Sequence, residues 1–147
     1  MASMEDLYQE IILDHNKRPR NFGPLKEATH RADGRNPLCG DELAVSLRLE
    51  GDRIEEARFQ GQGCAISKAS ASLMTEAVTG KRTAAARELA ERVCRGMAPE
   101  GRALVFEEVG DLAALSGVRR FPARVKCATL AWHALLGALE GRRETRT

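Results

Sequence analysis

The chain has 147 residues, of which 43% are hydrophobic and 30% are charged, and its formal net charge is +2. This length fits one globular domain. The small net charge gives no indication of a nucleic-acid partner, and no apolar run approaches the ~20 residues that a membrane-spanning helix needs. Segment 1–13 is acidic and lacks the uninterrupted apolar stretch of a secretory signal, so we expect a cytoplasmic protein without membrane association.

The first part of the chain predicts a helix followed by an antiparallel hairpin. Met4–His15 has apolar residues at helical spacing. A loop is expected over 16–24, a short edge strand over 28–33, and a second loop over 34–40. Segments 43–49 and 54–59 predict two strands joined by a tight reversal, because apolar and polar residues alternate in the first of them.

The rest of the chain predicts helices. One is expected from Ser67 to Thr79, another over 83–97, and one or two short pieces over 103–117. Pro122 is suited to begin a last helix that ends near Leu139. Residues 142–147 form a charged tail that we expect to be frayed. Together these elements predict a single α+β domain over 1–147, in which a small antiparallel sheet of about three strands is covered by helices.

Four cysteines are the chemically distinctive residues of the sequence. In a reducing compartment they favour metal or sulfur chemistry over disulfides, although their number alone fits four unrelated buried thiols equally well. Cys39, Cys64 and Cys127 lie at turns or helix starts, so we predict that they converge with Asp41 on one metal-binding and sulfur-handling site. Cys94 lies on an apolar helical stripe instead, and we expect it to be a buried structural thiol.

The spacing of the first two candidate ligands suits one ion. Side chains two residues apart in extended backbone point the same way, so Cys39 and Asp41 can face a common centre, and Gly40 between them lets the chain bend sharply. Cys64 precedes a predicted helix, and a helix N-terminus favours the thiolate form. Cys127 lies in the first turns of the last helix, close to basic residues at 124 and 126.

Three thiolates and one carboxylate form a four-coordinate set suited to Zn²⁺, Fe²⁺ or an iron–sulfur cluster. Purely structural zinc sites usually use paired CxxC or HxxxH spacings, which this chain lacks. A carboxylate oxygen on a thiophilic metal exchanges more readily than a fourth thiolate. The composition of the ligand set therefore favours a metal site with an exchangeable ligand over a purely structural metal site.

No histidine is expected at this site. His15 and His30 are predicted to be surface or hydrogen-bonded residues. His133 lies six residues after Cys127, on a different helical face. A cysteine hydrolase is disfavoured for the same reason, because no histidine is placed to act as its base.

Three motifs and the opening of the chain resemble a known family. The motifs are Asn-Pro-Leu-Cys-Gly-Asp at 36–41, Ala-Arg-Phe-Gln-Gly-Gln-Gly-Cys-Ala-Ile-Ser-Lys-Ala-Ser-Ala-Ser at 57–72, and Arg-Val-Lys-Cys-Ala-Thr-Leu-Ala-Trp at 124–132. With Leu-Tyr-Gln-Glu-Ile-Ile-Leu-Asp-His at 7–15 and Arg-Pro-Arg-Asn-Phe-Gly at 18–23, they resemble the IscU/NifU-N-like iron–sulfur cluster assembly family over nearly the whole chain.

Three departures from IscU-type scaffolds resemble the SufU-type branch. Lys126 stands where those scaffolds have a histidine, and Phe-Pro-Ala-Arg-Val-Lys at 121–126 replaces their Pro-Pro-Val-Lys chaperone-recognition motif. The gap between Cys64 and Cys127 is also longer than in those scaffolds. We expect the surplus to be a helical insertion at 83–117.

The resemblance implies an iron–sulfur cluster assembly protein, as a scaffold, as a zinc-dependent acceptor of persulfide sulfur, or as both. It implies zinc in the isolated protein, held by Cys39, Asp41, Cys64 and Cys127, and a transient [2Fe–2S] cluster in the scaffold role. Cys39 is the implied sulfur acceptor in the first role and Cys127 in the second, while Arg124 would stabilise the anionic site. The implied partners are a SufS-type pyridoxal-phosphate cysteine desulfurase and downstream assembly or acceptor proteins.

Such a protein is a carrier or scaffold, and at most a sulfurtransferase that acts together with the desulfurase. The sequence leaves open which occupant is physiological, which cysteine first accepts sulfur, which acceptor follows, and the oligomeric state. The competing reading is a structural zinc-binding interaction module, in which Asp41 would matter only for folding.

Overall fold

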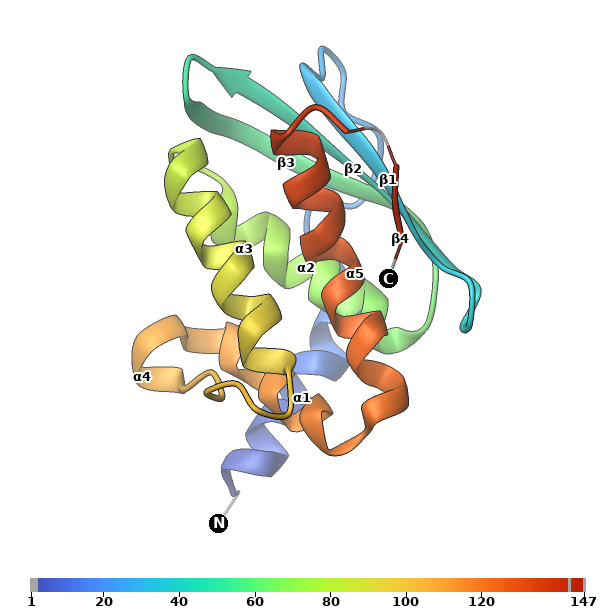
Figure 1. The fold of residues 1–147 in the computed structure, drawn as a ribbon, viewed down its shortest axis with the longest axis vertical. Coiled ribbons are helices and arrows are strands. Elements are labelled where there is room, and N and C mark those ends of the chain that lie inside the picture. The colour runs from blue at the N-terminus through green and yellow to red at the C-terminus, as the bar shows by residue number, and fades with distance from the viewer. Residues whose placement is uncertain (1–2, 143, 147) are drawn as a thin grey trace.

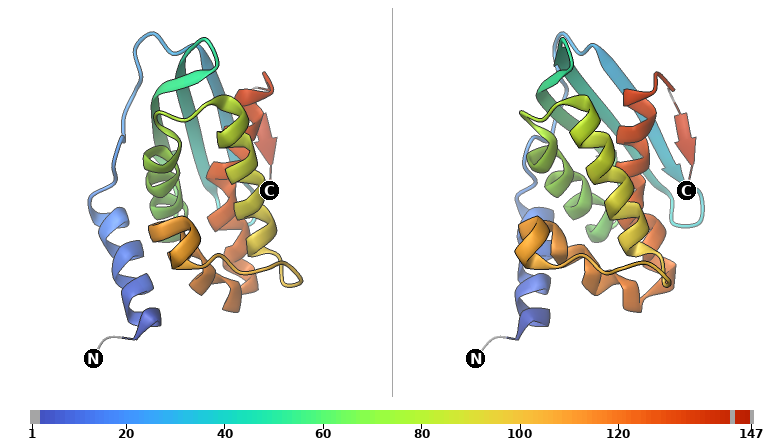
Figure 2. Two further views of the ribbon diagram at one scale, coloured as in Figure 1. Left: turned by 90° about the vertical axis from the view of Figure 1, so that its left-hand side faces the viewer. Right: turned by 60° about the vertical axis from the view of Figure 1, so that its left-hand side comes forward.

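The computed structural model describes residues 3–142 and 144–146, and its helices cover one face of a sheet (Figures 1 and 2). The elements in chain order are α1 (Met4–Lys17), β1 (His30–Asn36), β2 (Asp41–Glu50), β3 (Arg53–Gln62), α2 (Ala65–Val78), α3 (Thr83–Met97), α4 (Phe106–Val109), the 3₁₀ segment η1 (Gly110–Arg120), α5 (Pro122–Leu139) and β4 (Glu144–Arg146). In the described part of the chain, no helix combines the length and the apolar character required to cross a membrane.

The sheet has the order β3-β2-β1-β4. β2 pairs antiparallel with both β1 and β3, which confirms the predicted three-stranded antiparallel sheet. The hairpin between β2 and β3 turns at Gly51, whose φ of 63° lies in the left-handed region that glycine favours. Val45 pairs with Phe59 and both are fully buried, so the predicted alternation sends these side chains toward the helices.

β1 differs from the expected edge strand at 28–33, because it continues to Asn36 through residues that read as a loop. Gly34 explains why the strand can continue past residue 33. A Cβ there would lie 3.0 Å from the side chain of Leu130 on α5, so the helix packs too closely against this strand for a larger residue. The strand therefore carries the chain directly to the short turn that contains Cys39.

The charged tail also differs from the prediction of a frayed end over 142–147. Residues 144–146 form the short strand β4, parallel to β1, with Asp33 opposite Glu144. The unpaired backbone groups along the free edge of β1 offer hydrogen bonds that a sequence pattern does not reveal. Residues 143 and 147 lie outside the described residues.

The helical part matches the expected element types. Ser3 caps α1 in a reciprocal capping box with Asp6. Residues 83–117 contain α3, α4 and most of η1, so the segment is helical as expected. That this segment is an insertion relative to IscU-type scaffolds remains a prediction.

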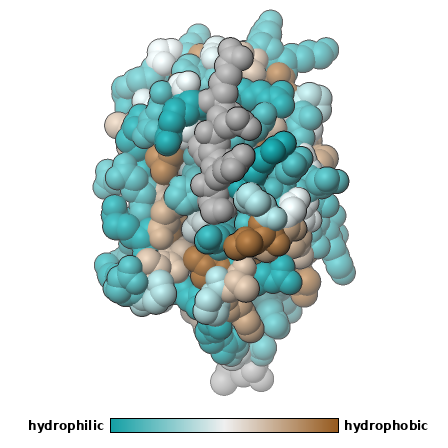
Figure 3. Space-filling model, turned by 45° about the vertical axis from the view of Figure 1, so that its right-hand side comes forward, coloured by the Kyte–Doolittle hydropathy of each residue, from teal (hydrophilic) through white to brown (hydrophobic). Residues whose placement is uncertain are grey.

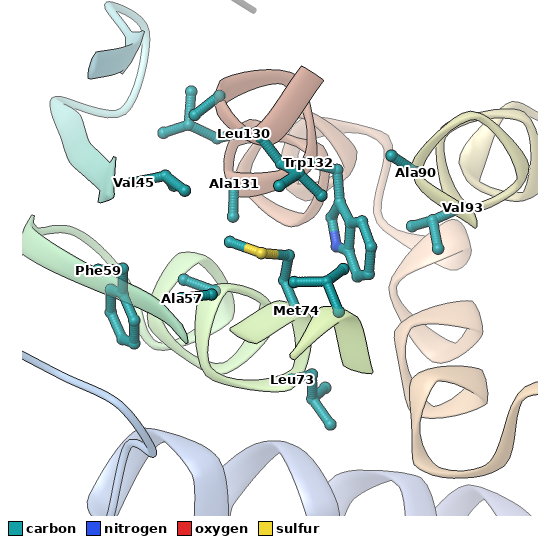
Figure 4. Close-up of a cluster of buried hydrophobic side chains, with 14 of the residues drawn as sticks. Val45, Ala57, Phe59, Leu73, Met74, Ala90, Val93, Leu130, Ala131 and Trp132 are labelled. Carbon is teal, nitrogen blue, oxygen red and sulfur yellow. The ribbon is translucent and has the colours of Figure 1, made fainter. Parts of the chain in front are cut away.

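Trp132 on α5 lies at the centre of the core and is fully buried (Figure 4). Its indole lies between Met74 of α2 and the Ala90–Val93 face of α3. The indole Nε1 donates a hydrogen bond to Ser70 Oγ at 3.1 Å, and Ser70 Oγ in turn donates to the carbonyl of Ala128 at 2.5 Å. These buried contacts fix α2 against α5 and so set the relative positions of the helix starts that carry Cys64 and Cys127.

Candidate metal and sulfur site

The first ligand segment is a tight turn between β1 and β2. The backbone N–H groups of Cys39 and Gly40 donate to the carbonyl oxygen of Asn36, at 3.1 and 2.9 Å. Gly40 has a φ of 72°, which allows the chain to reverse without strain before Asp41 begins β2. The turn leaves Cys39 exposed, while Asp41 is only 1% exposed. The two candidate ligands therefore approach the site from its surface and from its interior.

The Asp41 carboxylate is held by the start of α2. Its Oδ1 accepts a hydrogen bond from the backbone N–H of Cys64 at 2.9 Å, and its Oδ2 accepts one from Ser67 Oγ at 2.6 Å. Cys64 is the N-cap of α2, and its Sγ accepts from the backbone N–H of Ser67 at 3.5 Å. Gly63 makes this approach possible, because a Cβ there would lie 2.9 Å from Asp41 Oδ1.

The sulfur of Cys127 completes the group from α5. Cys127 is fully buried, and its Sγ lies 3.4 Å from Cys39 Sγ. Ligand atoms of Cys39, Asp41 and Cys127 lie within 4.8 Å of one another. Cys64 borders this cluster, with its Sγ 4.0 Å from Asp41 Oδ2. Figure 1 shows why these distant segments meet, since the β1–β2 turn and the N-terminal end of α2 lie at the same end of the sheet.

Charge is concentrated in this small space. Burial raises the pKa of the Cys127 thiol well above its ordinary value, and hydrogen bonding with Asp41 and Cys39 raises it further. The pKa of the exposed Arg124 guanidinium is raised, mainly by its interaction with Cys64 and further by its interaction with Cys127. Arg124 is thus a cation close to the sulfur atoms, and its role at the site remains a prediction.

The donor set fits a zinc ion. Zinc in proteins binds thiolate sulfur and carboxylate oxygen in a tetrahedral arrangement, and two sulfur ligands on it lie roughly 3.8 Å apart because each Zn–S bond is about 2.3 Å. The Cys39–Cys127 sulfur separation of 3.4 Å is close to that spacing. The separation of 4.0 Å between Cys64 Sγ and Asp41 Oδ2 is somewhat longer than the roughly 3.6 Å expected for a sulfur and an oxygen ligand on one zinc ion. A cation would also offset the charge of the buried Asp41 carboxylate.

The other singled-out residues lie elsewhere. Cys94 on α3 is half-buried, 3.9 Å from Nε2 of His133, and burial raises the pKa of its thiol to about 11. Cys94 is thus only partly buried, against the expectation of a buried thiol, and it packs against the core away from the candidate ligands. His15 is buried rather than exposed, and its Nδ1 lies 2.7 Å from Ser72 Oγ in the contact between α1 and α2.

Sequence reasoning missed two residues that touch the candidate ligands. Ser67 holds the Asp41 carboxylate, and the Nδ2 group of Asn36 donates a hydrogen bond to Cys127 Sγ at 3.7 Å. Both stand three positions from a cysteine within the motifs that suggested the site. The three-residue spacing was the available signal. The third residue of a helix, here Ser67, faces the N-cap residue. In a four-residue turn, the first residue, here Asn36, lies close to the last.

Two large apolar side chains are exposed in the segments that carry Cys39 and Cys127. Leu38, beside Cys39, is 81% exposed, and Phe121, at the start of α5, is 55% exposed. The face drawn in Figure 3 is mostly hydrophilic, with a small group of hydrophobic residues gathered in its lower half.

Comparisons with known proteins agree with this geometry. The model of the NifU-like N terminal domain matches residues 7–128. The chain is 44% identical over 135 residues to the zinc-dependent sulfurtransferase SufU of Bacillus subtilis, which covers 91% of this chain and 90% of that protein. It is 38% identical over 140 residues to the iron–sulfur cluster assembly scaffold protein IscU of Streptococcus pyogenes, which covers 95% of this chain and 87% of that protein.

Solved structures show the same fold. A SufU structure from Fervidobacterium islandicum, described as a candidate iron–sulfur cluster assembly scaffold protein for the SUF system, superposes with a TM-score of 0.82 at 33% identity. The match covers 93% of this chain and 99% of that one. The chain therefore belongs to the NifU-like N-terminal domain family, whose relatives include proteins of the SufU and IscU types.

Proposed function

We propose that this protein acts in iron–sulfur cluster assembly as a zinc-dependent acceptor of persulfide sulfur. The observation that carries the proposal is the convergence of exposed Cys39, buried Cys127 and buried Asp41, with Cys64 bordering the group through its contact with Asp41. The names of the relatives support it, because one is a zinc-dependent sulfurtransferase and another is a cluster assembly scaffold.

Cys39, Asp41, Cys64 and Cys127 would hold the zinc ion. When bound, zinc keeps the sulfur ligands in the thiolate form at neutral pH. Asp41 is oriented for this task by the start of α2, since both of its oxygen atoms accept hydrogen bonds from it. In a scaffold role the same residues would carry a transient [2Fe–2S] cluster as cargo.

Cys39 is the residue that we assign to sulfur uptake. It is exposed on a turn, whereas Cys127 is fully buried and Cys64 caps a helix. Its thiolate attacks the terminal sulfur of a persulfide on the partner enzyme. A new S–S bond forms on Cys39 while the S–S bond of the enzyme persulfide breaks, and the enzyme cysteine leaves as a thiolate, so no outside oxidant is needed.

Arg124 stabilises the site while this exchange takes place. Its guanidinium is exposed and faces the charge of the Cys64 and Cys127 sulfur atoms. A neighbouring cation stabilises a thiolate and also attracts an incoming persulfide anion. We therefore place Arg124 with Cys39 and Cys127 among the residues that handle sulfur.

The partner that fits this chemistry is a pyridoxal-phosphate cysteine desulfurase of the SufS type, in the cytoplasm, where thiols stay reduced. Downstream, an assembly or acceptor protein would take the sulfur from Cys39. Exposed Leu38 beside this cysteine gives the turn an apolar side chain with which to contact a protein partner.

The test combines metal analysis with sulfur transfer. Protein purified anaerobically is expected to contain one zinc per chain. Mixed with a SufS-type desulfurase and cysteine, it should stimulate alanine release and gain a sulfur atom that mass spectrometry locates on Cys39. Cys39→Ser should lose the added sulfur, while Cys94→Ser keeps it. Zinc binding without stimulation by the unmodified chain would instead favour a structural zinc module and would refute the proposal.

A further inference from the structure

Asn36 contacts the site through its backbone. It is the last residue of β1, is 1% exposed, and lies opposite Asp41 in the register with β2. Its carbonyl oxygen accepts the hydrogen bonds from Cys39 and Gly40 that close the turn. The position of Asn36 therefore fixes where the turn places Cys39 and where β2 begins with Asp41.

The side chain of Asn36 makes one contact at the site and leaves another atom unpaired. Its Nδ2 group donates to Cys127 Sγ at 3.7 Å. Its Oδ1 is the one buried side-chain nitrogen or oxygen atom, among the described residues, without a hydrogen-bond partner. A buried acceptor without a partner is unfavourable, so packing and stability do not explain an amide at this position.

Cys127 and Cys39 differ in what surrounds their sulfur atoms. Cys127 is fully buried and receives the amide hydrogen of Asn36. Cys39 is exposed, and the sulfur of Cys127 is its side-chain contact. A buried thiolate needs a hydrogen-bond donor from the protein in place of water, while an exposed thiolate receives hydrogen bonds from solvent.

We propose that Asn36 is a positioning residue that keeps Cys127 in the ligand set while Cys39 leaves it to take up sulfur. This inference rests on the proposed function, because it concerns the same ligands. The N–H donor stabilises negative charge on the buried sulfur and fixes its direction, as groups behind metal ligands commonly do. The unpaired Oδ1 is then the consequence of turning the amide toward Cys127.

The experiment compares Asn36→Asp and Asn36→Ala with the unmodified chain. Asn36→Asp keeps the shape of the side chain but replaces the N–H donor with an oxygen that repels the thiolate. Zinc affinity is measured by competition with a chelating dye, and thiolate-to-metal charge-transfer absorption is recorded on Co²⁺-loaded protein. Loss of a hydrogen bond to a metal ligand typically lowers affinity by about 10- to 100-fold, so both variants should bind zinc more weakly by that factor. Their charge-transfer bands should shift.

Asn21→Asp is the matched control, because the Nδ2 group of Asn21 donates to Thr75 Oγ1, away from the cysteines. Metal-free melting temperatures of both Asn36 variants should fall by no more than that of this control. Unchanged affinity and absorption in both variants would overturn the inference alone, as would an affinity loss matched by an equal loss of metal-free stability. Absence of zinc and Co²⁺ binding by the unmodified chain would overturn the proposed function, and this inference with it.

Discussion

Replacing Asp41 separates the structural role of its carboxylate from its role toward a metal. Asp41→Ala removes the acceptor of two hydrogen bonds, from the backbone N–H of Cys64 and the hydroxyl of Ser67. The hydroxyl has a second acceptor, since the carbonyl oxygen of Cys127 lies 3.3 Å away, but the N–H group of Cys64 loses its partner. Asp41→Asn keeps the size of the side chain and an oxygen acceptor, and removes only the negative charge.

The structure sets the size of the expected effects. A hydrogen bond to a charged group contributes about 1.5–3 kcal/mol, and releasing a buried charge offsets part of that loss. We therefore expect Asp41→Ala to destabilise the metal-free protein by about 1–3 kcal/mol, which lowers the melting temperature of a chain this long by roughly 2–10 °C. The fold should stay intact. Asp41→Asn should cost less than about 1 kcal/mol, because its oxygen can still accept from Cys64.

Sulfur transfer should respond differently from stability. Asp41→Ala removes the oxygen ligand, and Asp41→Asn replaces the carboxylate with a neutral amide that binds a metal more weakly. Stimulation of a SufS-type desulfurase by either variant should therefore fall at least about tenfold, a change equivalent to about 1.4 kcal/mol. Melting of chelator-treated protein and desulfurase stimulation by zinc-loaded protein are measured on the same preparations. Unchanged stimulation by Asp41→Asn would refute the proposed role. A melting-temperature loss in Asp41→Asn as large as in Asp41→Ala would refute the hydrogen-bond argument.

Three other variants test the surroundings of the site. Cys94→Ser should keep zinc content and sulfur transfer near normal, and loss of transfer in a folded variant would contradict its structural role. Burial lowers the pKa of His15, so the unfolded chain binds its proton first and stability should fall as pH drops below about 6.5; melting curves of His15→Gln should show a weaker decline. Gly63→Ala should displace Asp41 and speed zinc loss to a chelator, whereas Gly117→Ala, whose Cβ meets open space, should not.

The sequence was sufficient to predict the elements that hold the core, and it suggested the candidate ligands. Apolar residues alternate in β2 and recur at helical spacing in α5 because one side of each element is buried, and such a periodicity can be read from the sequence. Cys39 and Asp41 were recognisable because two residues of extended backbone bring side chains to one side. Their convergence with Cys127, however, was an interpretation of similar local settings that only the packing of α5 against β1 and β2 could test.

The contacts behind the ligands could not be predicted in the same way. Asn36 reads as a turn residue, and nothing in its neighbours signals that its amide reaches a sulfur on α5. Ser67 reads as one of several small residues on α2, and its hydrogen bond to Asp41 depends on the exact approach of two elements. The strand at 144–146 shows the same limit, since its pairing with β1 is made by backbone atoms and leaves no side-chain pattern.

The anchoring of the three cysteines is unequal, and this inequality is what a sulfur acceptor requires. Cys127 is enclosed by α5 and the sheet, and Cys64 is the N-cap of α2, so neither can leave without disturbing an element that packs in the core. Cys39 sits on a turn whose two hydrogen bonds are local, and its side chain faces solvent. Moving it needs rotation of one side chain and a small change in one turn, whereas moving either of the others would break helix or core contacts. The place of each cysteine in the fold therefore supports the proposal that one thiolate exchanges while the other proposed ligands stay.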